Sequence, residues 1–230
     1  MPLELHPLQE ADLPAYDEII HEAFRGDIGD LLYPNGYTPA DRTHSLTRAL
    51  QKWRQHPQTV QKTKVIDTAL PDTDPLNKII SVADWNFHPQ ERSEAELDAA
   101  DEEGQDAGFP PSANIPFMKH FFGLLSENKR RILGGKPHIL LHILVTHPRH
   151  HRRGVGAMQL EWGVAEARRL GVPVYLESSP MGRPLYERFG FETVGWLELD
   201  AREWGLDHDL PHALMLRPAD AETVVGEAVG

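Results

Sequence analysis

The stretch that decides the fold spans residues 139–156 and reads Ile139-Leu140-Leu141-His142-Ile143-Leu144-Val145-Thr146-His147-Pro148-Arg149-His150-His151-Arg152-Arg153-Gly154-Val155-Gly156. Its first seven residues are apolar apart from His142, which is typical of a strand buried on both faces. Apolar residues then recur at helical spacing from Val155 to Leu170, and Gly171 ends that helix. The stretch therefore predicts a buried strand, a basic glycine turn and a helix.

The glycine turn has the features of an anion site. Backbone N–H groups at a helix N-terminus attract a phosphate, and Arg152 and Arg153 add positive charge. Glycines let the chain turn without strain and let a phosphate approach the amides. The spacing is neither that of a P-loop nor that of a dinucleotide fingerprint. The alternative is a tight strand-to-helix turn with solvated arginines.

Working outward from the turn, the sequence before it predicts strands and helices in alternation. The expected elements are a strand at 3–8, a helix from Leu13 to Phe24, a loop at 26–40, a helix at 43–56, a hairpin of strands 59–67 and 78–87, and a helix at 115–133. Residues 88–114 carry an acidic run and Phe109-Pro110-Pro111, which predicts a surface insertion with little fixed structure.

After the turn, the expected elements are a strand at 172–177, a short helix at 184–189 and strands at 191–199 and 212–216. We expect one domain over residues 1–217, with the acidic insertion at 88–114, and a C-terminal tail at 218–230.

Composition excludes several classes of protein. The 230 residues hold 23 Lys+Arg against 35 Asp+Glu, a net charge of −12, which argues against nucleic acid and weakly favours cationic ligands such as amines. The absence of Cys excludes disulfides, thiolate zinc sites and a cysteine nucleophile. No apolar run has the length of a membrane span and no signal peptide is evident, so we expect no membrane contact and a cytoplasmic location.

Three segments together carry a resemblance to a known family. Residues 144–156, Tyr175-Leu176-Glu177 and the run from Gly182 to Phe191 resemble the Gcn5-related N-acetyltransferase (GNAT) superfamily, most of all its fungal small-molecule branch. The resemblance implies an α/β fold, with a twisted mixed sheet flanked by helices on both faces in a single domain. It also implies acetyl-CoA as cosubstrate and transfer of acetyl to an amine.

The same resemblance assigns the acetyl-CoA site. Main-chain groups of the core strand would bind the acetyl carbonyl and pantetheine, and the glycine turn would bind the pyrophosphate. His151 stands where the family usually has Gln or Arg, so phosphate affinity could depend on pH. The residues assigned to the cofactor are Leu144, Val145, Thr146, His151, Arg152, Arg153, Gly154, Val155, Gly156, Ala157, Ser178, Gly182, Leu185, Tyr186 and Phe189.

Two residues are predicted to be catalytic. Tyr186 occupies the family's general-acid position, where a phenol protonates the departing thiolate; the alternative is a tyrosine that packs on a strand. His142 is the candidate base, and strand alternation predicts that it shares a face with Leu140 and Leu144. In the arylalkylamine branch a histidine relay occupies this stretch, and only His142 of its two positions is a histidine here. A core histidine, a carboxylate at Glu177 or Asp84, or a water relay are the alternatives.

The expected acceptor is a small primary amine. Residues that would contact it are Tyr33, Asp84, Trp85 and Glu177. We expect no metal, because Pro148 prevents a regular helix that would align His147, His150 and His151. The protein would act as a monomer or homodimer. A non-catalytic acyl-CoA-binding module and an acetyltransferase for protein N-termini or lysines are the alternatives.

Overall fold

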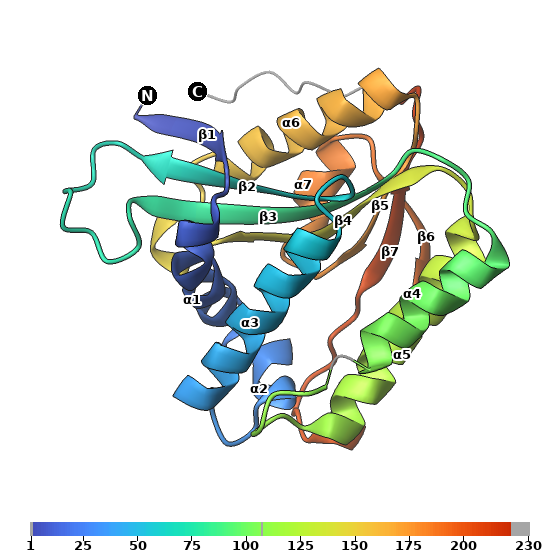
Figure 1. The fold of residues 1–230 in the computed structure, drawn as a ribbon, viewed down its shortest axis with the longest axis horizontal. Helices are drawn as coiled ribbons and strands as arrows, with labels where there is room; N and C mark the ends of the chain where they lie inside the picture. The colour runs from blue at the N-terminus through green and yellow to red at the C-terminus, as the bar shows by residue number, and fades with distance from the viewer. Residues whose placement is uncertain (1, 107, 222–230) are drawn as a thin grey trace.

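The computed structural model describes residues 2–106 and 108–221. Within them, the strands are β1 (Leu3–Pro7), β2 (Val60–Asp67), β3 (Ile79–His88), β4 (His138–Thr146), β5 (Val174–Ser178), β6 (Glu192–Trp196) and β7 (Ala213–Arg217). They form one mixed sheet in the order β1-β2-β3-β4-β5-β7-β6 (Figure 1). Among the strands of residues 2–106 and 108–221, only β4 and β5 are paired in parallel. The α/β fold with a mixed sheet is therefore confirmed.

Helices cover both faces of this sheet. They are α1 (Leu13–Phe24), α2 (Ile28–Leu32), α3 (Pro39–Gln55), α4 (Glu94–Asp106), α5 (Ile115–Leu133), α6 (Val155–Leu170) and α7 (Arg183–Arg188), with 3₁₀ turns η1 (Glu10–Asp12), η2 (Pro148–His150) and η3 (Ala201–Trp204). α6 and α7 pack on one face, and α1, α2, α3 and α5 pack on the other. We call these the α6 face and the α5 face. None of the described helices is long and apolar enough to cross a bilayer.

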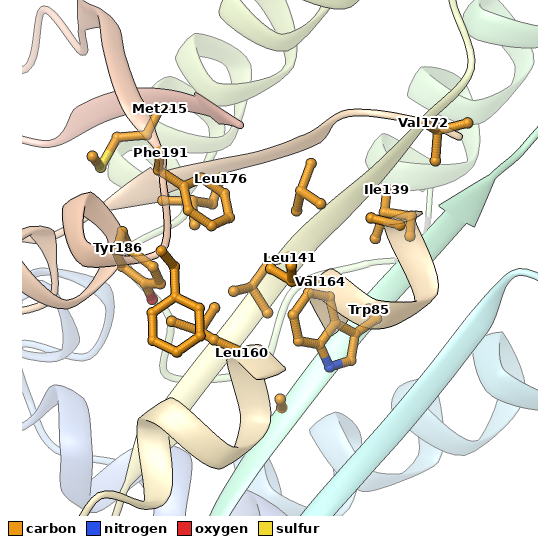
Figure 2. Close-up of a cluster of buried hydrophobic side chains, with 14 of the residues drawn as sticks. Trp85, Ile139, Leu141, Leu160, Val164, Val172, Leu176, Tyr186, Phe191 and Met215 are labelled. Carbon is orange, nitrogen blue, oxygen red and sulfur yellow. The ribbon is translucent and has the colours of Figure 1, made fainter. Parts of the chain in front are cut away.

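The core on the α6 face is closely packed (Figure 2). Trp85 of β3 is fully buried there beneath α6. Gly163 makes this contact possible, because a Cβ on it would lie 2.0 Å from the indole Cη2 of Trp85. The structure thus places Trp85, predicted to contact the acceptor, in the core instead.

The acidic insertion has more structure than expected. Residues 94–106 form α4, with Leu97 buried, instead of a segment with little fixed structure. Arg130 of α5 makes ion pairs with Glu94, Asp98 and Asp101, which attach α4 to α5. Of the predicted tail, residues 222–230 lie outside the described residues.

Candidate active site

The central feature of the site is a gap between the two parallel strands. β4 and β5 pair only at Ile139 with Val174 and at Leu140 with Tyr175. Beyond these pairs β4 continues to Thr146 and β5 to Ser178, but the two strands no longer pair with each other. One edge of β4 therefore has backbone N–H and C=O groups open to a ligand over the region that the sequence assigns to the acetyl and pantetheine groups.

His142 is the extra residue of a β-bulge next to this gap. Asp84 of β3 pairs with Ile143 and the following residue, Trp85, pairs with Leu141, so His142 has no partner on β3. The bulge breaks the expected alternation: Leu144 packs in the α6-face core while Leu140 packs in the α5-face core. The prediction that His142 shares one face with both leucines is wrong for Leu144, because a bulge adds one residue to the count.

His142 keeps part of its surface exposed although it lies in the middle of the sheet. The surrounding protein desolvates the ring and lowers its pKa to about 4. Asp84 acts to raise that pKa, while Lys52, Lys62 and Lys129 lower it further. His142 is therefore neutral at pH 7 and a weak base.

Glu177 lies across the gap from His142. Leu140 and Tyr175 are the last paired residues, and two residues further along each strand stand His142 and Glu177. Because side chains two apart share a face, Glu177 extends to the α5 face with Tyr175. Burial raises the pKa of Glu177 to about 7, although Tyr175 and Lys129 act to lower it.

The glycine turn has the geometry of an open helix N-terminus. Gly154 adopts φ +79° as the N-cap of α6, and no side chain caps this helix. Arg152 also has a left-handed φ of +59°. The ring of His151 hydrogen-bonds through Nε2 to the carbonyl oxygen of Thr146 at 3.0 Å, which holds the turn against β4. The first N–H groups of α6 have no partner within the helix, as an anion site requires.

The two arginines of the turn differ. Arg153 makes an ion pair with Asp67 of β2 at 2.6 Å and also contacts Nδ1 of His150. That pairing lowers the pKa of Asp67. Arg152 is exposed. The positive charge expected at the turn is thus partly neutralised by Asp67.

The turn meets the second half of the predicted cofactor site at α7. A Cβ on Gly156 would lie 2.9 Å from Cδ2 of Leu185. A Cβ on Gly182 would lie 2.9 Å from the ring of Tyr186. Gly156 therefore lets Leu185 of α7 pack against the start of α6, which brings these two segments together, while Gly182 makes room for the Tyr186 ring of its own helix.

Tyr186 lies on the α6 face. Its ring packs edge-on to Phe191 with centroids 5.7 Å apart, and 8% of its surface is exposed (Figure 2). Burial raises its pKa, so the phenol keeps its proton at neutral pH. Among the described residues its hydroxyl has no hydrogen-bond partner. Packing accounts for the ring but leaves the hydroxyl free to donate.

A buried ionic network that the sequence did not reveal surrounds Asp84. Lys62 of β2 pairs with the Asp84 carboxylate, and the Tyr16 hydroxyl donates to its Oδ2 at 3.2 Å. Burial acts to raise the pKa of Asp84, but Lys62 and His142 hold it below its usual value. The register of the predicted hairpin, which sets Lys62 opposite Asp84, was the signal that could have indicated this pair.

The remaining residues that were predicted to belong to the site lie at its edges. The hydroxyl of Ser178 donates to the Ser179 carbonyl at 2.8 Å. Ser178 also lines a hollow of about 310 Å³ with Arg183 and Trp196, among others. Tyr33 packs edge-on to Tyr37 near the start of α3. Among the described residues, no three His, Asp or Glu side chains are grouped as metal ligands.

Comparison with known proteins gives one family. The sequence model described as "Acetyltransferase (GNAT) family" matches residues 81–191, which include most of β3 and all of β4, α6, β5 and α7. A curated fungal protein, "Probable acyltransferase SID5" of Ajellomyces capsulatus, is 44% identical over 43 residues. That match covers 19% of this chain and 32% of the fungal protein, so it spans about a third of the relative's length.

Solved structures show the same fold. A mosquito "arylalkylamine N-Acetyltransferase like 5b" superposes with a TM-score of 0.62 at 19% identity, covering 94% of this chain and 99% of that one. The protein yncA of Salmonella typhimurium, solved "with its cofactor Acetyl-CoA", superposes with a TM-score of 0.56 at 12% identity, covering 96% of each chain.

Proposed function

Since the chain belongs to the GNAT superfamily of acetyltransferases, we propose that it transfers the acetyl group of acetyl-CoA to the primary amine of a small molecule by direct attack. The gap between β4 and β5, opening beside an uncapped glycine turn, is the observation that carries this proposal. It fits a long thioester that runs from the turn into the sheet. The amides at Gly154, Val155 and Gly156 would bind the pyrophosphate, and the open edge of β4 would bind the pantetheine.

The candidate base and the candidate acid lie on opposite faces of the sheet. His142 and Glu177 flank the gap on the α5 face, whereas Tyr186 lies on the α6 face. An acceptor amine would approach from the α5 face. The sulfur of the thioester would then leave toward Tyr186. This arrangement suits direct attack, because the group that takes the proton and the group that gives one stand on opposite sides of the reacting carbon.

Among the candidate bases, Glu177 fits best. A base works best when its pKa is near the working pH, and the pKa of Glu177 is about 7 while that of His142 is about 4. We therefore assign proton acceptance to Glu177. His142 then acts as a neutral hydrogen-bonding group that orients the amine or an intervening water.

The reaction balances with these roles. The nitrogen of a neutral amine forms a bond to the thioester carbonyl carbon, and the C–S bond breaks. The nitrogen's proton passes to Glu177, while the phenol of Tyr186 gives a proton to the thiolate. Glu177 then returns its proton to the Tyr186 phenolate through solvent, which restores both residues.

One experiment separates this function from a non-catalytic acyl-CoA module. The chain contains no Cys, so release of the CoA thiol can be followed with a thiol reagent without background from the protein. We expect acetyl-CoA to raise the melting temperature and a panel of small amines to release thiol. An N-terminal peptide and a lysine peptide serve as competing acceptors. Stabilisation without thiol release from any acceptor would support the module instead.

The pH dependence of kcat/KM tests the base. With Glu177 as base, the rate rises as pH increases through about 7, because the carboxylate loses its proton there. Glu177→Gln should remove this rise of kcat/KM near pH 7, the acidic limb of the pH profile. It should also lower kcat by about 100-fold at pH 7.5. His142→Gln should slow the reaction but leave the limb near pH 7 in place. A limb that moves in His142→Gln and persists in Glu177→Gln would assign the proton transfer to His142.

Tyr186→Phe tests the acid. The hydroxyl interacts with the sulfur mainly as charge develops on it, so its removal should lower kcat by about 10- to 100-fold. The dissociation constant for acetyl-CoA should change less than twofold, since the ring and its contact with Phe191 remain. Wild-type turnover by Tyr186→Phe would return this residue to a packing role.

A further inference from the structure

The buried ionic network around Asp84 has no part in the roles assigned so far. Asp84 of β3 is 7% exposed, and its Oδ2 is held by Lys62 of β2 and by the Tyr16 hydroxyl of α1, the latter at 3.2 Å. The Lys62 ammonium also donates to the Tyr16 oxygen at 3.3 Å. The second carboxylate oxygen, Oδ1, is buried and has no hydrogen-bond partner among the described residues. A buried carboxylate oxygen without a donor costs free energy, so Oδ1 lacks a partner that the site should supply.

The register of β3 and β4 places His142 beside this carboxylate. Asp84 pairs with Ile143, Trp85 pairs with Leu141, and His142 is the bulged residue between the two pairs. Residues opposite each other on paired strands have Cβ atoms about 4.5–5.5 Å apart. His142, the residue before Ile143, therefore lies within reach of the Asp84 side chain.

The two side chains also share the α5 face of the sheet. Tyr16, which bonds Asp84, belongs to α1 on that face. Leu141 packs in the α6-face core, so the next residue, His142, faces the other way. Lys62 reaches Asp84 from β2, on the side of β3 away from β4. Because the two oxygens of a carboxylate diverge, Oδ1 is the one left for a donor on the β4 side.

The ring of His142 can supply that donor. It makes no hydrogen bond to another described residue, and part of the residue is exposed. A neutral imidazole has one N–H donor and one acceptor nitrogen. With the N–H pointed at Asp84, the acceptor nitrogen is left for a ligand. An N–H pointed at the acceptor amine instead would occupy the lone pair that has to attack the thioester.

The charges around the pair keep the ring neutral. Burial lowers the pKa of His142 to about 4. The charged groups that act on the ring come from β2, β3, α3 and α5, and they are Lys62, Asp84, Lys52 and Lys129. The charge of Asp84 is balanced by its ion pair with Lys62, and Lys129 is opposed by Glu177 and Asp101. Asp84 can therefore orient the ring at pH 7 without protonating it.

We propose that Asp84 is a positioning residue whose Oδ1 accepts the ring N–H of His142 and so turns the other ring nitrogen toward the acceptor amine. The inference rests on the proposed acetyl transfer. His142 then accepts an N–H of the neutral amine, directly or through a water, and the lone pair of the amine stays free to attack. Glu177 receives the proton, as above. Tyr16 and Lys62 hold Asp84 in place from α1 and β2.

The tautomer of His142 tests this pairing in the full chain. With isotope-labelled histidine, NMR observes the two ring nitrogens of His142, which are assigned by their loss in His142→Gln. We expect a single neutral tautomer at pH 7.5, because one ring nitrogen is fixed as the donor. Asp84→Asn should turn it into a mixture of tautomers. A mixture already present in the wild type would overturn the inference, and this result needs no variant of Asp84 to fold.

Two further variants separate this role from a structural one. Asp12→Asn is the matched control, because it breaks another buried ion pair of β2, that of Asp12 with Lys64, and should leave the tautomer and kcat unchanged. Tyr16→Phe removes a hydrogen bond to Asp84 but keeps its ion pair with Lys62. It should lower kcat by about threefold with partial mixing of the tautomers. The same mixing in Asp12→Asn would overturn the inference.

Turnover completes the test. Asp84→Asn should lower kcat at least tenfold with little change in KM for acetyl-CoA, and the rise of kcat/KM near pH 7 should remain, since it belongs to Glu177. In the His142→Gln background the same change should cost less than twofold, because the ring is gone. Equal losses in both backgrounds would overturn the inference. A single tautomer that depends on Asp84, in a chain that acetylates no amine, would support the pairing and refute the transferase.

Discussion

Gly163→Ala is expected to destabilise the protein by about 3 kcal/mol, although alanine is the better helix former. The added Cβ would lie 2.0, 2.4 and 2.5 Å from three atoms of the Trp85 indole. Trp85 is fully buried between α6 and the sheet, so the ring has no open space to move into. The overlap therefore has to be relieved by moving α6 away from the core, which loosens contacts along the whole helix.

Urea unfolding followed by circular dichroism measures this effect. Gly123→Ala on α5 is the matched control, because a Cβ there meets nothing within 4 Å. That variant should be stabilised by up to about 1 kcal/mol, the opposite sign. Adding Trp85→Phe to Gly163→Ala should recover part of the loss, since the smaller ring leaves room. Equal stability of Gly163→Ala and the wild type would refute the close contact.

Trp85 also shows what local sequence patterns leave open. The hairpin that carries it was predicted correctly, since β2 and β3 pair as expected. Which face of that hairpin meets α6 and which meets the acceptor depends on the distant helices, and both faces of β3 are buried. An aromatic residue next to Asp84 was therefore as compatible with a pocket as with a core.

The bulge at His142 limits the prediction of the site in another way. The apolar run, the turn and the helix from 139 to 170 could all be predicted, because each has a local signal in the sequence. A bulge has no such signal here, and it moves Leu144 to the face opposite Leu140. The position of Glu177 across from His142 follows only from the pairing register of β4 and β5.

Ion pairs between residues far apart in the sequence account for the other differences between the sequence-based predictions and the structure. The segment that forms α4 has few apolar residues, so its composition predicted little structure, yet Arg130 of α5 pairs with three of its carboxylates. In the same way, the ion pairs of Arg153 with Asp67 and of Lys62 with Asp84 join residues far apart in the chain. Net charge carries no information on such local groupings.

Gly156→Glu is expected to abolish acetyl-CoA binding, with a loss of at least 100-fold in affinity. The carboxylate would stand in the first turn of α6, where the open amides would otherwise receive a phosphate. Its negative charge repels the pyrophosphate, and its bulk fills the approach to those amides. The Cβ itself contacts only the flexible end of Leu185, at 2.9 Å, so the fold itself should survive the change.

Thermal denaturation with and without acetyl-CoA measures the loss. At a ligand concentration of about 100 Kd, binding stabilises the wild type by about 2.7 kcal/mol, which for a chain of this size is about 5–10 °C. Gly156→Glu should gain less than about 1 °C under the same conditions. Gly123→Glu introduces the same side chain at an open helix position and should keep the full gain. If Gly156→Glu keeps it too, the cosubstrate's phosphates do not bind at this turn.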